Sequence, residues 1–117
     1  MVGREFAAQF LRLEGLEGKA PATLRNHRRA LARFSAWLSA ENILEAALTP
    51  LDLTRYICDI GERYPRDQVN IEISALRVYF RWLTEVGVRP GNPAAKLRFF
   101  PVEPKPVESL SLEEVRQ

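Results

Sequence analysis

Residues that usually carry enzyme chemistry are scarce in this chain of 117 residues. It contains one cysteine, Cys58, and one histidine, His27. A single thiol cannot form a disulfide within one chain, and the apolar neighbours of Cys58 predict a small buried side chain. The sequence has no Cys/His set with metal-ligand spacing, no glycine-rich phosphate loop and no acid pair placed for hydrolysis. We therefore expect no metal, no cofactor and no catalytic residue, and a reducing, cytoplasmic setting.

Long apolar runs are missing as well. No stretch approaches the length of a membrane span, and the N-terminus, with Arg4 and Glu5 ahead of Phe6, lacks the apolar core of a signal peptide. We therefore expect no membrane association. With 46% hydrophobic and 27% charged residues, the chain suits one globular domain with a modest core, neither a disordered tail nor two domains.

Negative charge is missing from the stretch between Gly18 and Ala40, which has five basic residues and no acidic one. At 100° per residue, the apolar side chains share one helix face: Leu24, His27, Leu31, Phe34 and Leu38. The arginines lie on the far side: Arg25, Arg28, Arg29 and Arg33. This far side is either a solvated helix face or a face that binds a polyanion. Unbroken like charge at four-residue spacing destabilises a helix slightly and usually alternates with Glu, which favours the polyanion.

Apolar periodicity and end signals predict an all-α chain. The four expected helices cover residues 4–16, 22–40, 50–62 and 67–86, with a short extra turn at 43–48 and an irregular tail after 88. The clearest start is Thr49–Asp52, where Thr caps, Pro occupies the first helical position and Asp faces the positive end of the helix dipole. Thr23 is expected at the N-cap or in the first turn of the second helix. Gly87 is expected to end the fourth.

The fourth helix has two apolar stripes, which is typical of the central helix of a bundle. One stripe is Val69, Ile73, Leu76, Phe80 and Leu83, and the other is Ile71, Ala75, Val78 and Trp82. Between the stripes lies a narrow polar strip made of Asn70, Ser74, Arg77 and Arg81. The strip either faces the same ligand as the basic helix or is merely solvated, and this helix alone does not separate the two interpretations.

The tail after Gly87 has a different character. Its prolines predict an extended, semi-rigid linker: Pro90, Pro93, Pro101, Pro104 and Pro106. Residues 102–109 are expected to make few contacts with the bundle, and Lys105 would lie beside any bound polyanion. A capped helix start appears at Ser111–Glu114. We expect that the chain stops just inside a following domain.

Several motifs follow one another along the chain. They are the basic helix with Thr23, His27 and Leu31 at four-residue spacing, the sequence Ile73-Ser74-Ala75-Leu76-Arg77, the turn Asn92-Pro93-Ala94, the proline-rich linker and the opening Leu110-Ser111-Leu112-Glu113-Glu114. In this order they resemble the N-terminal core-binding, SAM-like domain of tyrosine recombinases and phage integrases. The resemblance spans nearly the whole chain.

The resemblance implies a small orthogonal bundle of four principal helices that forms one half of a clamp around duplex DNA. It divides the chain into a core-binding domain (1–100), an interdomain linker (101–110) and the truncated start of a catalytic domain (111–117). In the family, the groups that cleave and rejoin DNA lie in that second domain. The resemblance therefore implies that this chain catalyses nothing, while its full-length parent is a DNA-cleaving and rejoining enzyme.

A few positions depart from the family pattern. The family usually has Tyr where this chain has His27 and Asp where it has Ala30. We interpret His27 as a buried replacement for the tyrosine, since it falls on the core face, and not as a metal ligand or a general base. The family also tends to have Arg near the start of the fourth helix, where this chain has Ile71 and Glu72. The expected contacts on this helix therefore shift to Gln68, Asn70, Ser74 and Arg77.

The expected partner is double-stranded DNA, bound in integration or recombination, together with other protomers of the recombinase assembled on that DNA. The chain alone is expected to be a monomer. The expected DNA-binding residues are Lys19, Thr23, Arg25, Asn26, Arg28, Arg29, Arg33, Gln68, Asn70, Ser74, Arg77, Arg81 and Lys105. The alternative is a helical protein-interaction module that docks partners through an exposed apolar face, either Ile71, Val78 and Trp82 or Phe99 and Phe100. Salt separates the two, because only DNA binding weakens steeply with ionic strength.

Overall fold

The computed structural model describes residues 2–101 and contains four α-helices and one 3-10 turn in that range. The elements are α1 (Val2–Leu16), α2 (Pro21–Ala40), the 3-10 turn η1 (Glu45–Ala47), α3 (Pro50–Gly61) and α4 (Arg66–Glu85). The all-α prediction is confirmed, and each predicted helix end lies within two residues of the observed one. The linker at 102–109, Lys105 and the helix start at Ser111 lie outside the described residues.

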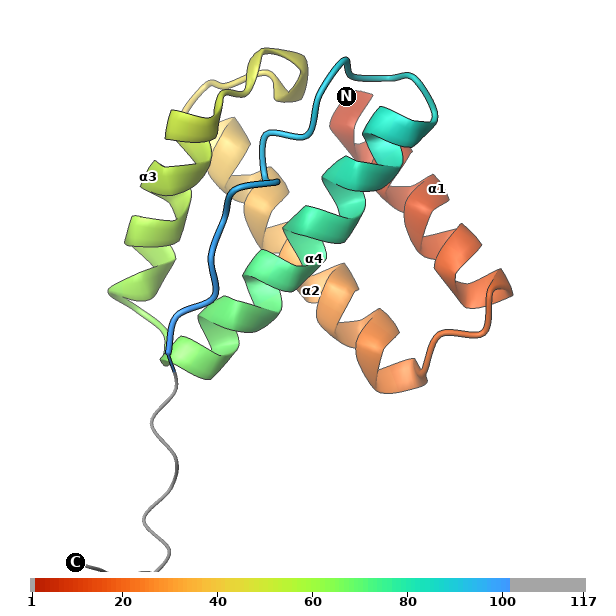
Figure 1. The fold of residues 1–117 in the computed structure, drawn as a ribbon, viewed down its shortest axis with the longest axis horizontal. Helices are drawn as coiled ribbons and strands as arrows, with labels where there is room; N and C mark the ends of the chain where they lie inside the picture. Colours follow the sequence, from red (N-terminus) through yellow and green to blue (C-terminus); the bar gives the residue numbers. More distant parts are fainter. Residues whose placement is uncertain (1, 102–117) are drawn as a thin grey trace, which may run out of the picture.

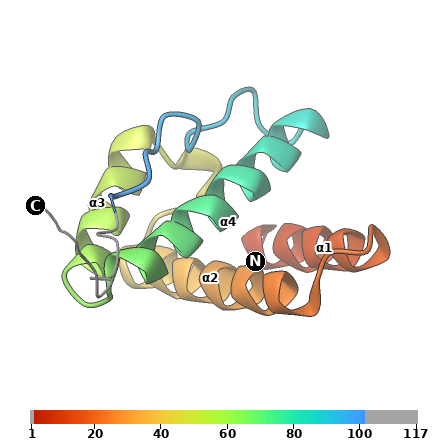
Figure 2. The same ribbon diagram turned by 60° about the horizontal axis from the view of Figure 1, so that its bottom comes forward.

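Helix α4 occupies the centre of the bundle, as its two apolar stripes predicted. It packs most extensively on α2 and also contacts α1 and α3, and it crosses over α1 and α2, which lie side by side (Figures 1 and 2). All five residues of its first stripe are buried, whereas Ile71, Val78 and Trp82 of the second are half-buried. The core of α3 is also as predicted, with Leu53, Tyr56, Ile57 and Ile60 buried.

The helix ends follow local chemistry. Thr49 and Asp52 form a capping box at α3: the Thr49 hydroxyl accepts from the Asp52 N–H, and the Asp52 carboxylate accepts from the Thr49 N–H. Gly87 has φ of 84°, a conformation that favours glycine, and it follows the last turn of α4 as expected. Helix α2, unlike α3, has no side-chain cap: its N-cap is Ala20. Thr23 lies within the first turn, which is one of its two expected places.

The predicted burial of Cys58 is wrong. Cys58 is exposed, because it lies on the outer side of α3 between the core residues Ile57 and Ile60. On α1, Leu13 keeps 38% of its surface exposed, while the neighbouring Glu14 is buried at 2%. Residues next to a core position on a helix can turn either way, and the choice depends on the neighbouring helix.

After α4 the chain runs back along that helix, and we call residues Asn92–Pro101 the strap. In Figure 1 it is the blue segment that runs between α3 and α4 toward the start of α4. It is irregular, as expected for the region after residue 88. The strap is anchored by the Asn-Pro-Ala turn, where the Asn92 side chain accepts from the Ala94 N–H at 2.8 Å and Ala94 is fully buried.

Candidate nucleic-acid interface

Three arginines of α2 form an exposed basic face. Arg25, Arg28 and Arg29 are all exposed, and within the described residues none of their side chains makes an ion pair or hydrogen bond. Arg25 and Arg29 lie four residues apart on the side opposite the core, whereas Arg28 borders a groove along α1. Their charges are therefore available to a ligand.

The first turn of α2 adds to this positive potential. No side chain caps it, and it contains no acidic residue. The uncapped N–H groups of a helix start carry partial positive charge and bind anions well. Lys19, which precedes the helix, is exposed, and Thr23 and Asn26 in its first two turns are half-buried.

Arg33 turns inward, unlike the other arginines predicted on this helix. Its guanidinium donates to the Glu72 carboxylate of α4 at 2.5 Å and lies 4.5 Å from the centre of the Tyr64 ring. The Arg33 side chain is 28% exposed, but its positive charge is already balanced by the Glu72 carboxylate. The structure therefore separates Arg33 from the exposed set of Arg25 and Arg29.

Glu72 is the buried centre of a network that the sequence analysis did not foresee. It is 1% exposed, and its second carboxylate oxygen accepts from the Tyr56 hydroxyl at 2.6 Å. Burial raises the pKa of Glu72, while the hydrogen bonds from Tyr56 and Arg33 oppose that rise. Burial and the facing carboxylate raise the pKa of Tyr56. Through Glu72 the helices α2, α3 and α4 share one polar anchor; its position between Val69 and Ile73 on the core face was the available signal.

The polar strip of α4 is divided between the strap and solvent. The Asn70 amide is occupied by the backbone of Phe100, and Arg77 donates to the Leu97 carbonyl at 3.5 Å with its guanidinium 5.5 Å from the Phe99 ring. Ser74 and Gln68 are half-buried, and Arg81 is exposed. The strap therefore takes up one side of the strip and leaves the other side open.

Acidic residues surround two of the predicted basic contacts. Lys19 and Arg81 line one small recess between α1 and α4, together with Glu14, Glu17 and Glu85. Neither Lys19 nor Arg81 forms an ion pair among the described residues. The acidic neighbours lower the local positive potential of this recess.

His27 is buried, as predicted from its place on the core face of α2. Its Nδ1 lies 2.7 Å from the Glu14 carboxylate, and its ring is stacked 6.3 Å from the Phe10 ring. The other Glu14 oxygen has no hydrogen-bond partner in the described part of the chain. His27 thus links α1 to α2, and no set of three His, Cys, Asp or Glu residues between positions 2 and 101 could hold a metal ion.

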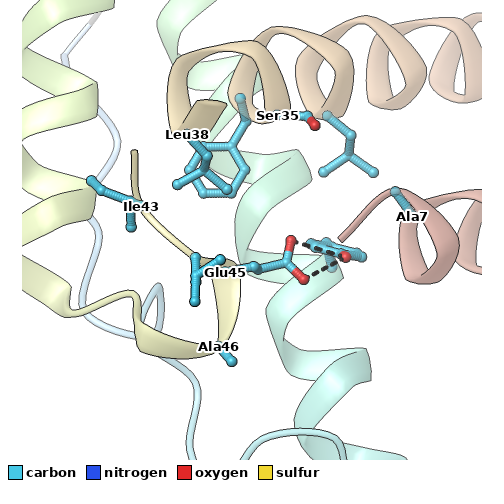
Figure 3. Close-up of a pocket in the computed structure, with 10 residues that line it drawn as sticks. Ala7, Ser35, Leu38, Ile43, Glu45 and Ala46 are labelled. Carbon is cyan, nitrogen blue, oxygen red and sulfur yellow. Dashed lines mark hydrogen bonds between the residues drawn. The ribbon is translucent and has the colours of Figure 1, made fainter. Parts of the chain in front are cut away.

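A separate apolar cavity of about 430 Å³ lies between α1, α2 and η1. Ala7, Leu38 and Ile43 contribute to its walls (Figure 3). Its polar corner is Glu45, whose carboxylate accepts from the Tyr79 hydroxyl at 3.2 Å. Burial raises the pKa of Glu45, opposed by Tyr79 and by the charge of Arg89. This site differs in kind from the basic face, because it suits an apolar group.

Comparison with known proteins points to one family. The model of the phage integrase N-terminal SAM-like domain matches residues 8–87. The tyrosine recombinase XerC of Pelobacter propionicus is 30% identical over 87 residues, which cover 72% of this chain and 29% of that protein. No solved structure matches the chain significantly. No helix within residues 2–101 is long and apolar enough to span a membrane.

The family model covers α2, α3 and α4 and all but the first turns of α1. It therefore includes both the basic face of α2 and the polar strip of α4. Because the match extends over more than half of the residues and agrees with the observed all-helical fold, the chain belongs to the family of phage integrase N-terminal SAM-like domains.

Proposed function

We propose that this chain binds duplex DNA as one half of a clamp in a site-specific tyrosine recombinase. The observation that carries the proposal is the exposed, unpartnered set Arg25, Arg28 and Arg29 on α2. Duplex DNA carries a phosphate charge about every 1.7 Å of its axis, and arginine forks on such a face neutralise phosphates and release counterions.

The open start of α2 supports the same assignment. A phosphate placed at its uncapped first turn would accept from backbone N–H groups and face the positive end of the helix dipole. Lys19 and Thr23 lie at this end, and Asn26 and Arg29 follow one turn apart. A helix fits the major groove, so this end of α2 reaches base edges while Arg25 and Arg29 contact the backbone.

Helix α4 contributes a smaller share of the proposed contacts. Its open side chains are Gln68, Ser74 and Arg81. Arg33, Asn70 and Arg77 are less available to DNA, because each already has a partner inside the protein. Lys105 lies beyond the described residues and keeps its proposed role beside the duplex.

The domain division follows from the same proposal. Residues 1–100 would form the DNA-binding domain, 101–110 the linker, and 111–117 the start of the next domain. The XerC relative is about three times as long as the part matched here. Cleavage and rejoining of DNA, with assembly of several protomers on it, would then belong to a longer parent protein, and this chain would bind DNA without catalysis.

Fluorescence anisotropy with a labelled duplex of random sequence tests the proposal. We expect weak binding at low salt, with log K falling by about three units per tenfold rise in salt if three to four phosphates are contacted. Flat salt dependence, or no binding at low salt, would refute the assignment.

The alternative of a protein-docking module loses one of its surfaces. Val78 and Trp82 pack partly against the core, and Trp82 lies 5.6 Å from the Phe10 ring, so this stripe is not an open face. The other expected face, Phe99 and Phe100, is exposed, and together with the cavity beside Glu45 it still favours docking. An apolar group bound there would show little salt dependence, which keeps the two functions separable.

A further inference from the structure

The strap retraces α4 in the opposite direction and is held along its length. Its anchors descend the helix in order: the Asn92 amide donates to the Arg77 carbonyl at 3.5 Å, the Asn70 amide meets Phe100, and the Arg66 guanidinium donates to the Pro101 carbonyl at 3.3 Å. Residue 101 therefore lies beside the first turn of α4, although the helix ends at Glu85.

Asn70 provides the tightest of these anchors. Its Nδ2 donates to the Phe100 carbonyl at 2.9 Å, and its Oδ1 accepts from the Phe100 N–H at 2.7 Å. The side-chain amide thus pairs with a backbone peptide group as a neighbouring β-strand would, fixing both position and orientation. The Phe100 ring borders a recess with Gly61 and Val69, where α3 and α4 meet.

We infer that Asn70 is a positioning residue, which clamps Phe100 and so holds residue 101 beside the start of α4. This inference rests on the proposed function, because the position of residue 101 would set the side of the duplex from which a second half-clamp is delivered. It also gives Asn70 a task other than the DNA contact expected from its place on the polar strip. The strap, through residue 101, then belongs to the folded domain.

Amide hydrogen exchange measured by NMR on the 117-residue chain tests the clamp. Asn70→Ala removes both hydrogen bonds, and we expect the Phe100 amide to exchange at least about tenfold faster. Asn70→Asp keeps the acceptor for the Phe100 N–H but loses the donor, so we expect a smaller increase. Gln68→Ala on the same helix is the control, because within the described residues the Gln68 amide group has no hydrogen-bond partner. Unchanged Phe100 exchange in Asn70→Ala would overturn the inference.

A distance measurement tests the direction of the strap. Cys58 is exposed and is the only cysteine, so it can be spin-labelled together with Arg98→Cys. Pulsed electron paramagnetic resonance should give a narrow distribution of distances between the labels at positions 58 and 98. After Asn70→Ala is added, the distribution should become broad. Unchanged circular dichroism would confirm that the bundle itself stays folded. A distribution that stays narrow in Asn70→Ala would overturn the inference.

DNA titration separates this inference from the proposed function. We expect Asn70→Ala to change duplex affinity less than about twofold, because Asn70 acts on the strap and not on DNA. A large gain in affinity would mean that the strap competes with DNA, and a large loss would mean that Asn70 contacts DNA; either result overturns the positioning role. If the unsubstituted 117-residue chain bound no DNA while Asn70→Ala still released Phe100, the proposed function would fail and the clamp would stand.

Discussion

Helices α2 and α3 both have exposed arginines, but these arginines differ in whether an acidic side chain pairs with them. On α3, Arg55 pairs with Glu41 at 2.8 Å and with Asp52 at 3.4 Å, and it lies 5.7 Å from the Trp37 ring. On α2, Arg25 and Arg29 have no such partner among the described residues. The same residue type is therefore neutralised on one helix and left open on the other.

The two helix starts show the same difference. Helix α3 begins with a complete capping box, and its hydrogen bonds with Thr49 lower the pKa of Asp52. Helix α2 begins at Ala20 with no side-chain cap. A helix end without a cap forgoes about 1 kcal/mol, so the open end of α2 costs stability that an anionic ligand would restore. Surfaces that leave their own charges unsatisfied are the ones to examine for a ligand.

Removing the carboxylate that neutralises the inner side of α2 should have the largest effect. Glu72→Ala leaves Arg33 and the Tyr56 hydroxyl without their acceptor, and we expect a loss of about 3 kcal/mol of unfolding free energy. Urea unfolding followed by circular dichroism measures it. The double variant Arg33→Leu/Glu72→Leu removes both charges, and its free energy of unfolding should lie closer to that of the unsubstituted chain. Equal losses in both variants would show that the ion pair is not the source of the effect.

Charge reversal tests the comparison directly. Arg25→Glu/Arg29→Glu should lower duplex affinity about 30-fold, equivalent to about 2 kcal/mol, through two lost phosphate contacts and added repulsion. Arg55→Glu/Arg63→Glu has the same charge change on the α3 side and should cost less than about threefold. Anisotropy titrations at one fixed salt concentration measure both, and similar losses in the two variants would break the distinction between the helices.

Exchanging the capping chemistry of the two helix starts gives effects near 1 kcal/mol. Thr49→Ala should destabilise the domain by about that amount and leave DNA binding unchanged. Ala20→Asp should stabilise it by about 0.5 kcal/mol, because the new carboxylate caps α2, yet lower duplex affinity about threefold. Ala20→Asn provides a cap without charge. Tighter binding by Ala20→Asp would contradict an anion site at this helix end.

The smallest expected effect concerns pH and Glu45. Because burial raises its pKa in the folded state, Glu45 stabilises fully only below its unfolded pKa, and this contribution is lost as pH rises through the folded pKa. The stability of the unsubstituted chain relative to Glu45→Gln should therefore fall as pH rises above the ordinary pKa of a glutamate, about 4.3. We expect a change below about 1 kcal/mol, since Glu45 is only half-buried. A difference that grows with pH would contradict the direction of the shift.

Much of the fold could be predicted from local chemistry. The capping box at Thr49, the glycine after α4 and the apolar periods of α3 and α4 each act within a few residues, so the sequence displays them directly. The family resemblance rested on the same local motifs. The burial of His27 was predicted for the same reason, but its partner Glu14 was not, because the two meet only when α1 packs on α2.

The sequence by itself determined the four helices, their boundaries to within two residues, and the basic stretch on α2. Only the tertiary structure decided which arginines stay open: Arg33 pairs with the buried Glu72, whereas Arg25 and Arg29 form no ion pair or side-chain hydrogen bond with any described residue. It also decided that the strap occupies Asn70 and Arg77. The physical reason is range. Helix signals act over three or four residues, whereas the partner of a charged side chain here lies 39 positions away and comes close only after α4 has packed on α2.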